Sequence, residues 1–297
     1  MVMKRIAVTG LSGVIGKILS EALVSEYSVI DLFHSAKHTR NKRIKKHIFL
    51  DLSKKRNICK ALDEARPDVI VHMAAITHID VCEADKKRGK NGPVWKTNVE
   101  GTKVVAKYSA SNNIPLVFLS TECVFDGRSE FFAEDAKKSP INWYGVTKNE
   151  AEEEIFASGA KFTIIRSVVA YHKEDDSMTI YGKILKGLRR NSKIFMVDDQ
   201  LFTPTYTYDI VKAIHKVINK NIRGVIHVAP SKNISPYNFA LLIASRNKFV
   251  HSMVVKTKLI KLYGVEKAAL RLKNSSLHTE QSAKKLGFKA KHPEKAI

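Results

Sequence analysis

Three evenly spaced glycines near the start of the chain constrain its fold more than any other feature. The stretch TGLSGVIG, residues 9–16, follows a short apolar run and leads at once into a segment with apolar residues at helical spacing. In a strand–turn–helix unit, the first glycine permits a tight turn, the second lets the backbone approach a pyrophosphate, and the third lets the helix pack closely on the strand. The start of the helix offers that anion free N–H groups and the positive end of the helix dipole. Glycines that serve only a turn would show the same spacing, but the context predicts a dinucleotide site made by Gly10, Ser12, Gly13, Val14, Ile15 and Gly16.

The rest of the chain repeats the alternation of strand and helix. Short apolar runs rich in β-branched residues are typical of strands buried on both faces of a parallel sheet. The runs are KRIAVTG, YSVIDLF, PDVIVHMA, PLVFLST, KFTIIRSVV and GVIHVA. Apolar residues recur at helical spacing from Ile15 to Leu23 and again from Ile210 to Ile218. This alternation predicts an α/β fold with a doubly wound parallel sheet, a Rossmann domain.

Two stretches break this rhythm. Residues 169–200 and 229–297 are more polar, richer in lysine and less periodic. We expect them to form a smaller C-terminal α/β lobe that binds the substrate. Residues 1–168 and 201–228 would then form the NAD(P)-binding Rossmann domain.

Residues near the ends of the next strands bear on the cofactor. Asp31 ends the second predicted strand, 21 residues after the first glycine, where a carboxylate accepts hydrogen bonds from the adenosine ribose and repels a 2′-phosphate. That position favours NAD(H), yet His34, Ser35 and Lys37 could receive the phosphate, so NADP(H) stays open. Asp51 could contact the adenine amine or cap the next helix. Small residues after VIVHM would leave room for the dinucleotide, or would simply pack in the core. This second part of the predicted cofactor site comprises Asp31, Leu32, Asp51, Leu52, Ala74 and Ala75.

Composition limits the other classes of function. The chain carries 51 Lys and Arg against 29 Asp and Glu, and this net charge of +22 attracts polyanions. The densest basic run is KHTRNKRIKKH, residues 37–47, but no helix-turn-helix, RRM or zinc-finger pattern accompanies it. We therefore expect a solvated, lysine-rich surface without specific nucleic-acid binding. The sequence has no apolar run long enough to predict a membrane span. Three scattered cysteines, without a Cys/His cluster, predict reduced thiols, no metal site and a cytoplasmic location.

A tyrosine and a lysine four residues apart raise the question of catalysis. In NWYGVTK, residues 142–148, Tyr144 and Lys148 would share one face of a helix, about one turn apart. The same spacing arises by chance at protein surfaces. The pair alone therefore does not decide between a catalytic and an ordinary surface role.

Together with further stretches, the pair marks a resemblance to a known superfamily. TGLSGVIG, WKTNVEGT, LSTECVFDG and YGVTK occur in an order that resembles the extended short-chain dehydrogenases/reductases over essentially the whole chain. Within that superfamily the chain looks most similar to dTDP-4-dehydrorhamnose reductases and their relatives, on HMAAITHIDVCEAD, VDDQLFTPTYTYDI and LRLKNSSLHTEQSAKKLGF. The resemblance implies an NAD(P)H-dependent reductase of a nucleotide-activated 4-keto-6-deoxy sugar. Such an enzyme would act in the cytoplasm in deoxysugar and polysaccharide biosynthesis, with a homodimer as one expected assembly.

The resemblance also assigns catalytic roles. Hydride transfer to a ketone builds negative charge on its oxygen, and the implied set is Thr121, Tyr144 and Lys148. Tyr144 would donate the proton, Lys148 would lower the pKa of the phenol and hold the nicotinamide ribose, and the Thr121 hydroxyl would orient the carbonyl. Ser120 is the alternative to Thr121, because neighbours on a strand point to opposite faces. Asn98 would face the active site and steady its water, backbone and cofactor links, unless it is a surface helix residue.

Several positions depart from the pattern of that family. After the catalytic threonine, sugar-nucleotide dehydratases carry two acids and rhamnose-forming reductases carry Asp-Tyr, whereas this chain has Glu122 and Cys123. Val168 replaces a tryptophan, and HKEDDSM follows it after a short interval. We expect an altered sugar pocket that includes Glu122, Val168, Gln200 and Arg271, with Arg271 either near the diphosphate or exposed in a basic tail. The alternative functions are an epimerase with tightly bound NAD and a non-catalytic cofactor-binding regulatory subunit, as in methionine adenosyltransferase.

Overall fold

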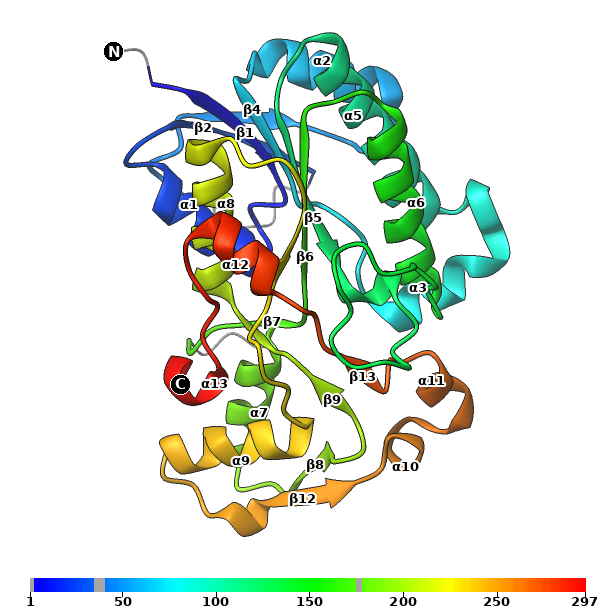
Figure 1. Cartoon of the computed structure of the whole chain (residues 1–297), viewed down its shortest axis with the longest axis vertical. Helices are drawn as coiled ribbons and strands as arrows, with labels where there is room; N and C mark the ends of the chain where they lie inside the picture. Colours follow the sequence, from blue (N-terminus) through cyan, green and yellow to red (C-terminus); the bar gives the residue numbers. More distant parts are fainter. Residues whose placement is uncertain (1–2, 35–40, 175–177) are drawn as a thin grey trace.

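The computed structural model describes residues 3–34, 41–174 and 178–297, and it confirms the predicted doubly wound parallel sheet (Figure 1). Seven strands lie side by side in the order β11-β6-β5-β4-β1-β2-β3. The strands β2 and β3 extend the sheet on one side of β1, and β4, β5, β6 and β11 extend it on the other, so the order of the strands reverses next to β1. The strands are β1 (Arg5–Thr9), β2 (Ser28–Phe33), β3 (Lys46–Phe49), β4 (Val69–His72), β5 (Leu116–Thr121), β6 (Phe162–Ser167) and β11 (Gly224–Val228).

Helices cover both faces of this sheet. One face is covered by α1 (Val14–Leu23) and α8 (Thr207–Lys220), and the other by α2 (Lys55–Ala65), α5 (Gly101–Ser111) and α6 (Trp143–Ala157). Before α5 the chain forms α3 (Ile79–Asp85), a 3₁₀ segment (Lys86–Asn91), α4 (Pro93–Trp95) and a π-helical turn (Lys96–Glu100).

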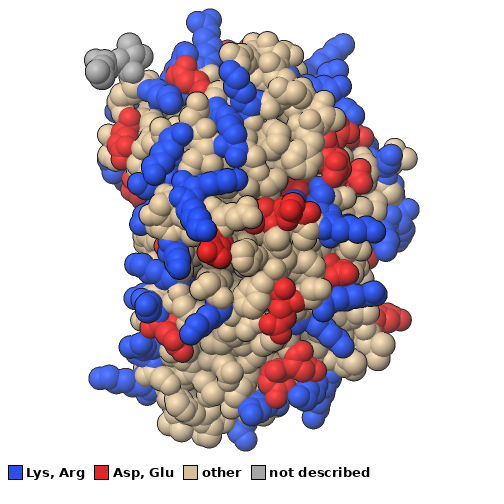
Figure 2. Space-filling view, in the orientation of Figure 1, with Lys and Arg blue, Asp and Glu red and all other residues tan. Residues whose placement is uncertain are grey.

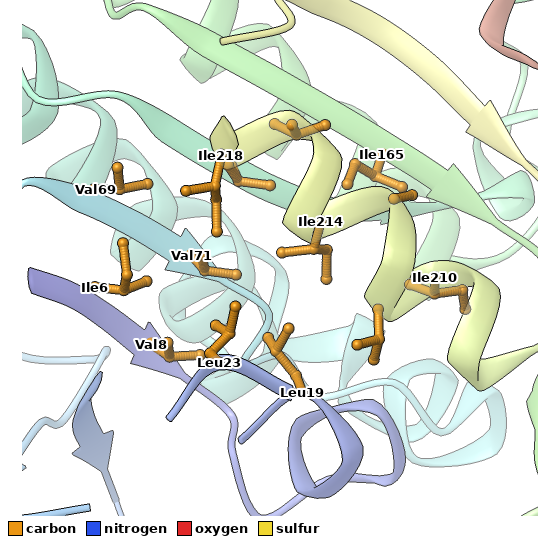
Figure 3. Packing of buried hydrophobic residues seen from close by; sticks show 14 of the residues in the cluster. Ile6, Val8, Leu19, Leu23, Val69, Val71, Ile165, Ile210, Ile214 and Ile218 are labelled. Carbon is orange, nitrogen blue, oxygen red and sulfur yellow. The ribbon is translucent and has the colours of Figure 1, made fainter. Parts of the chain in front are cut away.

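The core follows from the two-residue repeat of the strands. In β1, Ile6 and Val8 point into the cluster beneath α1 and α8, while Ala7 points into the cluster on the opposite face. Figure 3 shows Leu19 of α1 and Ile214 of α8 packed over the sheet residues of the first cluster. Apolar residues on both faces of each strand are therefore needed, which explains the uninterrupted apolar runs in the sequence.

The second lobe lies below the sheet in Figure 1 and has its own apolar core. Its helices are α7 (Ile180–Arg189), α9 (Pro236–Arg246), α10 (Leu259–Tyr263), α11 (Val265–Ala269) and α13 (Pro293–Ala296). Its strands form three parallel pairs: β7 (Ala170–Tyr171) with β10 (Thr205–Tyr206), β8 (Ile194–Val197) with β12 (Val254–Thr257), and β9 (Leu201–Phe202) with β13 (Asn274–Ser275). Tyr171 and Phe239 are fully buried at its centre.

Two segments lie on the other side of the predicted domain boundaries. β9 and β10, predicted within the sheet domain, pair with strands of the second lobe. In contrast, α12 (Glu280–Leu286), predicted within the lobe, packs on α8 and β11, where Leu286 joins the core of the sheet domain. The C-terminal segment therefore fastens the two parts of the molecule together.

The surface is basic on both parts of the molecule. On the face shown in Figure 2, Lys and Arg side chains are spread from top to bottom with acidic groups among them. Part of the basic run 37–47 lies outside the described residues. Within the three described ranges, no helix is long and apolar enough to cross a bilayer.

Candidate active site

A cleft of about 570 Å³ opens at the carboxyl edge of the sheet. Parallel strands end at the same edge, so the residues that follow β1, β4, β5 and β6 meet there. The start of α6 completes the wall. The cleft is lined by Gly10, Ser12, Gly13, Val14, Ile15, Gly16, Met73, Ala74, Ala75, Thr77, Ile79, Leu119, Ser120, Thr121, Glu122, Cys123, Tyr144, Lys148, Ser167, Val168, Val169, Ala170 and Met178.

The glycine turn has the backbone that its spacing predicts. Gly10 has φ +84°, and a Cβ there would lie 2.9 Å from the Ala74 nitrogen. A Cβ on Gly16 would lie 2.3 Å from the Gly10 oxygen, so any other residue would push α1 away from the turn. At Gly13 the nearest atom would be 3.4 Å away, so the protein leaves this backbone open. Gly13 is also the N-cap of α1 and carries no capping side chain, so the first helical N–H groups remain available to an anion. The cradle fits a dinucleotide pyrophosphate.

Thr9 and His72 hold the loop after β4 against this turn. The Thr9 Oγ1 accepts hydrogen bonds from the nitrogens of Met73 (3.1 Å) and Ala74 (3.0 Å), and it lies 2.8 Å from Nδ1 of His72. Burial lowers the pKa of His72 to about 3, so the ring is neutral. Its Nδ1 then accepts a hydrogen bond from the Thr9 hydroxyl. Sequence reasoning missed this pair. Polar residues at the ends of two buried strands are the signal that could have found it.

Asn98 is an internal clamp on the loop that follows the two alanines. It is 1 % exposed, which excludes the surface role. Its Oδ1 accepts from the Ile76 nitrogen (2.8 Å), and its Nδ2 donates to the Ile76 oxygen (2.9 Å) and to Thr147 Oγ1 (3.1 Å). Asn98 therefore joins the loop after β4 to α6, although it does not line the cleft itself.

The structure brings Tyr144 and Lys148 to the cleft on the first two turns of α6. The helix begins at Trp143 because the Asn142 side chain caps it, accepting from the Gly145 nitrogen at 2.7 Å. Lys148 is 2 % exposed, its Nζ donates to the Leu119 oxygen at 2.7 Å, and the amine lies 3.7 Å from the centre of the Phe118 ring. Burial lowers the pKa of Lys148 to about 7, although Glu152 on the next turn opposes this.

The electrostatics of Tyr144 differ from the expectation. Burial raises the pKa of its phenol well above 10, and the neighbouring Cys123 and Glu122 raise it further when ionised. The predicted lowering by Lys148 is wrong for this arrangement, because the amine is directed to the Leu119 oxygen. Tyr144 is therefore fully protonated at neutral pH, which is the state that a proton donor requires.

Thr121 and Ser120 have different partners, as their alternation on β5 predicts. The Ser120 hydroxyl donates to Glu152 Oε1 at 2.6 Å, and the Thr121 hydroxyl donates to Glu122 Oε2 at 2.7 Å. The partner of Ser120 stays ionised, because Arg166 lowers the pKa of Glu152 against the effect of burial, whereas burial raises the pKa of Glu122, the partner of Thr121, to about 7. A protonated Glu122 can release the Thr121 hydroxyl, so Thr121 is the better placed of the two to meet a carbonyl in the cleft. Glu122 lines the cleft beside it.

A buried ion pair supports these residues from behind. The Glu152 carboxylate accepts from Arg166 at 3.0 Å (Nε) and 2.7 Å (Nη2), and Lys138 Nζ lies 3.3 Å away. Arg166 also donates from Nη1 to the Glu134 oxygen at 2.9 Å, on the loop after β5. Sequence reasoning missed this pair. An arginine inside the apolar run KFTIIRSVV is the signal, because a buried guanidinium needs a carboxylate.

The predicted adenosine contacts lie outside the cleft lining. β2 runs to Phe33, so Asp31 does not end the strand as predicted. Asp31 is buried with its Oδ2 2.9 Å from Nδ1 of His47, and Leu32 is buried beside it. His34 stacks against Phe49, while Ser35 and Lys37 lie outside the described residues.

Asp51 closes a local turn. Its Oδ1 accepts from the nitrogen (2.9 Å) and hydroxyl (2.7 Å) of Ser53, and the Ser53 hydroxyl lowers the pKa of the carboxyl against the effect of burial. The capping alternative is wrong, because Lys54 is the N-cap of α2. Leu52 is buried next to it. The adenine contact of Asp51 and Leu52 stays a prediction.

On the substrate side, only Val168 and Glu122 of the predicted residues line the cleft. Gln200 donates from Nε2 to the Leu272 oxygen at 2.7 Å. Arg271 is not an exposed tail residue: both oxygens of Asp80 accept from its Nη2 at 3.1 Å, and its guanidinium lies 3.9 Å from the Tyr263 ring centre. Gln200 and Arg271 thus fasten the loop that precedes β13. Among the described residues, no cluster of three or more His, Cys, Asp or Glu is placed to hold a metal.

The doubly wound sheet, the open glycine turn and the Tyr–Lys pair define a Rossmann-fold protein of the short-chain dehydrogenase/reductase class. A family model described as the RmlD substrate binding domain matches residues 3–297, and the chain belongs to this family. It is 25% identical over 293 residues to a dTDP-4-dehydrorhamnose reductase of Sinorhizobium fredii, covering 96% of this chain and 92% of that protein. It is 24% identical over 252 residues to methionine adenosyltransferase 2 subunit beta of Danio rerio, covering 81% and 73%. A crystal structure of the Bacillus anthracis dTDP-4-dehydrorhamnose reductase in complex with NADP has a TM-score of 0.84 and 27% identity, covering 100% of this chain and 97% of that one.

Proposed function

We propose that this chain is an NAD(P)H-dependent reductase of a nucleotide-activated 4-keto-6-deoxy sugar, acting in deoxysugar and polysaccharide biosynthesis. The observation that carries the proposal is the meeting of Thr121, Tyr144 and Lys148 with the open glycine turn in one cleft. The family and the relatives named dTDP-4-dehydrorhamnose reductase support the class of substrate. A single acid, Glu122, after the catalytic threonine speaks against a dehydratase, which needs two.

The reaction divides between the cofactor and the protein. When bound, the reduced nicotinamide supplies the hydride. The turn of Gly10, Gly13 and Gly16 holds the pyrophosphate, and Ala74 and Ala75 leave room beside it. Tyr144 then donates its proton to the oxygen that gains charge, and the Thr121 hydroxyl donates a hydrogen bond to the same oxygen.

Lys148 has two tasks in this proposal. Burial favours the neutral amine of Lys148, whereas Glu152 on the next turn favours the charged ammonium. Once the amine leaves the Leu119 oxygen, its positive charge would stabilise the phenolate that forms when Tyr144 gives up its proton. Releasing the Leu119 oxygen would free the amine to bind the ribose of the cofactor.

Tyr144→Phe tests the role of the phenol. We expect kcat to fall on the order of a thousandfold, about 4 kcal/mol of barrier, because no other described hydroxyl in the cleft is a comparable acid. The assay follows absorbance of NADH or NADPH with a panel of 4-keto nucleotide sugars, which also settles the choice of cofactor. Tyr208→Phe is the matched control, since this tyrosine is 44 % exposed on α8. Near-normal turnover by the Tyr144 variant would exclude the proposed role.

The similarity to methionine adenosyltransferase 2 subunit beta favours one second candidate, a regulatory subunit that binds cofactor without turnover. A protein partner that co-purifies with the chain, together with no consumption of reduced nicotinamide, would support it. An epimerase would instead retain NAD through purification and consume no added NADH. We further propose a cytoplasmic location, because Cys59, Cys82 and Cys123 are all free thiols. A homodimer stays a prediction.

A further inference from the structure

Glu122 follows Thr121 directly, in the 3₁₀ turn Glu122–Val124 between β5 and α6. Its carboxyl group is buried, 8 % exposed, and lines the cleft. The Thr121 hydroxyl oxygen accepts a hydrogen bond from the Cys123 nitrogen at 3.2 Å and donates its proton to Glu122 Oε2 at 2.7 Å. The hydroxyl that should meet the substrate carbonyl is thus already engaged by a neighbouring acid.

A hydroxyl group has one proton and two lone pairs. An ionised Glu122 can only accept, so it takes the single proton of Thr121 and leaves none for a carbonyl. A protonated Glu122 can donate to the second lone pair of the Thr121 oxygen, while the Cys123 nitrogen occupies the first. The proton of Thr121 is then free to point into the cleft.

We infer that Glu122 is a positioning residue, whose protonated carboxyl turns the Thr121 hydroxyl toward the substrate carbonyl and whose ionised form withholds that proton. This inference rests on the proposed reductase function. It deepens that function by making the hydrogen bond from Thr121 to the substrate depend on the protonation state of Glu122, a control that we call the gate.

The surroundings of Glu122 allow both protonation states near neutral pH. Burial raises the pKa of its carboxyl to about 7, and hydrogen bonds from Thr121, its own backbone and Cys123 limit the rise. The titratable groups near it are the Cys123 thiol in the same turn, Tyr144 and Lys148 on α6, and Cys82 on α3 beside Tyr144. Glu152 and its partner Arg166 lie behind β5, bound to Ser120.

The sign of the pH effect follows from these states. Below pH 7 Glu122 is protonated and Thr121 is free to donate. As the pH rises through about 7, Glu122 ionises and accepts the hydrogen bond that the Thr121 hydroxyl donates. The carboxylate also raises the pKa of Tyr144, so the phenol is a weaker acid. Both effects slow the reduction at high pH. From pH 6 to pH 8.5 the protonated fraction of a group with this pKa falls from about 0.91 to about 0.03, roughly 30-fold.

Glu122→Gln tests the gate, because the glutamine amide is a permanent donor to Thr121. The measurement is kcat/KM between pH 5.5 and 9 for the wild type, for this variant and for Glu130→Gln, a control at an exposed carboxyl eight residues along the chain. Burial lowers the pKa of Lys148 to about 7 as well, so both groups affect the same pH range. The informative quantity is therefore the number of ionisations that the decline of kcat/KM at high pH reports. We expect the falling limb of E122Q to report one ionisation fewer than the wild type, while E130Q keeps the wild-type profile. An E122Q limb identical to the wild type would overturn the inference.

A second measurement needs no turnover. Infrared difference spectroscopy of the ligand-free protein follows ionisation of the Glu122 carboxyl, assigned as the signal that E122Q lacks. Thr121→Val removes the hydrogen bond that favours the carboxylate, so we expect the midpoint to rise by about one pH unit. An unchanged midpoint would refute the coupling of the two residues. If the wild type reduces none of the keto sugars, the proposed function fails, and this titration still decides whether Glu122 controls Thr121.

Discussion

The buried pair of Glu152 and Arg166 provides a quantitative test of how the catalytic helix is held. Glu152→Ala removes the carboxylate that accepts from Arg166 at 2.7 Å and 3.0 Å, and from Ser120 at 2.6 Å. The guanidinium, 2 % exposed, would keep its bond to the Glu134 oxygen, a contact with His227 and its place over the Phe125 ring, but no carboxylate among these partners. Breaking a buried pair from one side costs about 3–5 kcal/mol, because the remaining charge is uncompensated. We expect the free energy of unfolding to fall by that amount.

The neighbouring acid supplies the control. Glu153 also has a basic partner, Lys138 at 2.5 Å, but its side chain is 54 % exposed. A surface pair of this kind contributes about 0–1 kcal/mol, so Glu153→Ala should change stability little. Urea unfolding followed by circular dichroism gives both free energies. Equal losses for the two variants, or a loss below about 1 kcal/mol for Glu152→Ala, would refute the reasoning.

The same pair predicts a pH dependence of stability. Burial alone would raise the pKa of Glu152, but Arg166, Ser120 and Lys138 together lower it. A group whose folded pKa is depressed stabilises the protein above its unfolded pKa, about 4.5 for this glutamate, and loses this contribution as the pH falls. The difference between the wild type and Glu152→Ala should therefore shrink below about pH 4. A difference that is constant down to pH 3 would contradict the assignment.

Two further predictions concern the glycine turn and the asparagine clamp. Gly16→Ala should cost about 1–3 kcal/mol of stability, because its Cβ would lie 2.3 Å from a backbone oxygen, whereas Gly13→Ala should cost less than about 1 kcal/mol yet weaken dinucleotide binding. Urea unfolding and a fluorescence titration with NADPH separate the two effects, and equal stability losses would argue against the proposed roles. Asn98→Ala should destabilise by about 1–3 kcal/mol, because it strips both backbone groups of Ile76 of partners, while Asn112→Ala, at an exposed position, serves as the control.

The sheet domain was predictable because its determinants are local. Each strand is a short apolar run, and each covering helix shows its own periodicity, so neighbouring residues carry the information. The glycine turn is local as well, since only glycine suits the φ of +84° at Gly10. The Tyr144–Lys148 pair needs only a helix, and the Asn142 cap supplies its start.

The second lobe and the domain boundary were less predictable. Its strands have two to four residues, and each pairs with a partner far away in the sequence, such as β9 with β13. A two-residue strand has no periodicity to read. The position of α12 against α8 likewise depends on a contact between distant segments, with Leu286 reaching the core of the sheet domain.

What the sequence determined by itself is the set of chemical groups: a glycine cradle, a tyrosine, a lysine and a threonine at the ends of successive elements. Only the tertiary structure decided how those groups are charged and connected. It buries Lys148 and half-buries Tyr144, and the loss of solvent moves the pKa of each; it also directs the Lys148 amine to the Leu119 oxygen. It also places the Glu122 carboxyl on the Thr121 hydroxyl and Arg271 on Asp80. Desolvation and hydrogen bonding depend on which residues surround a group in space, and that information is not present in the spacing along the chain.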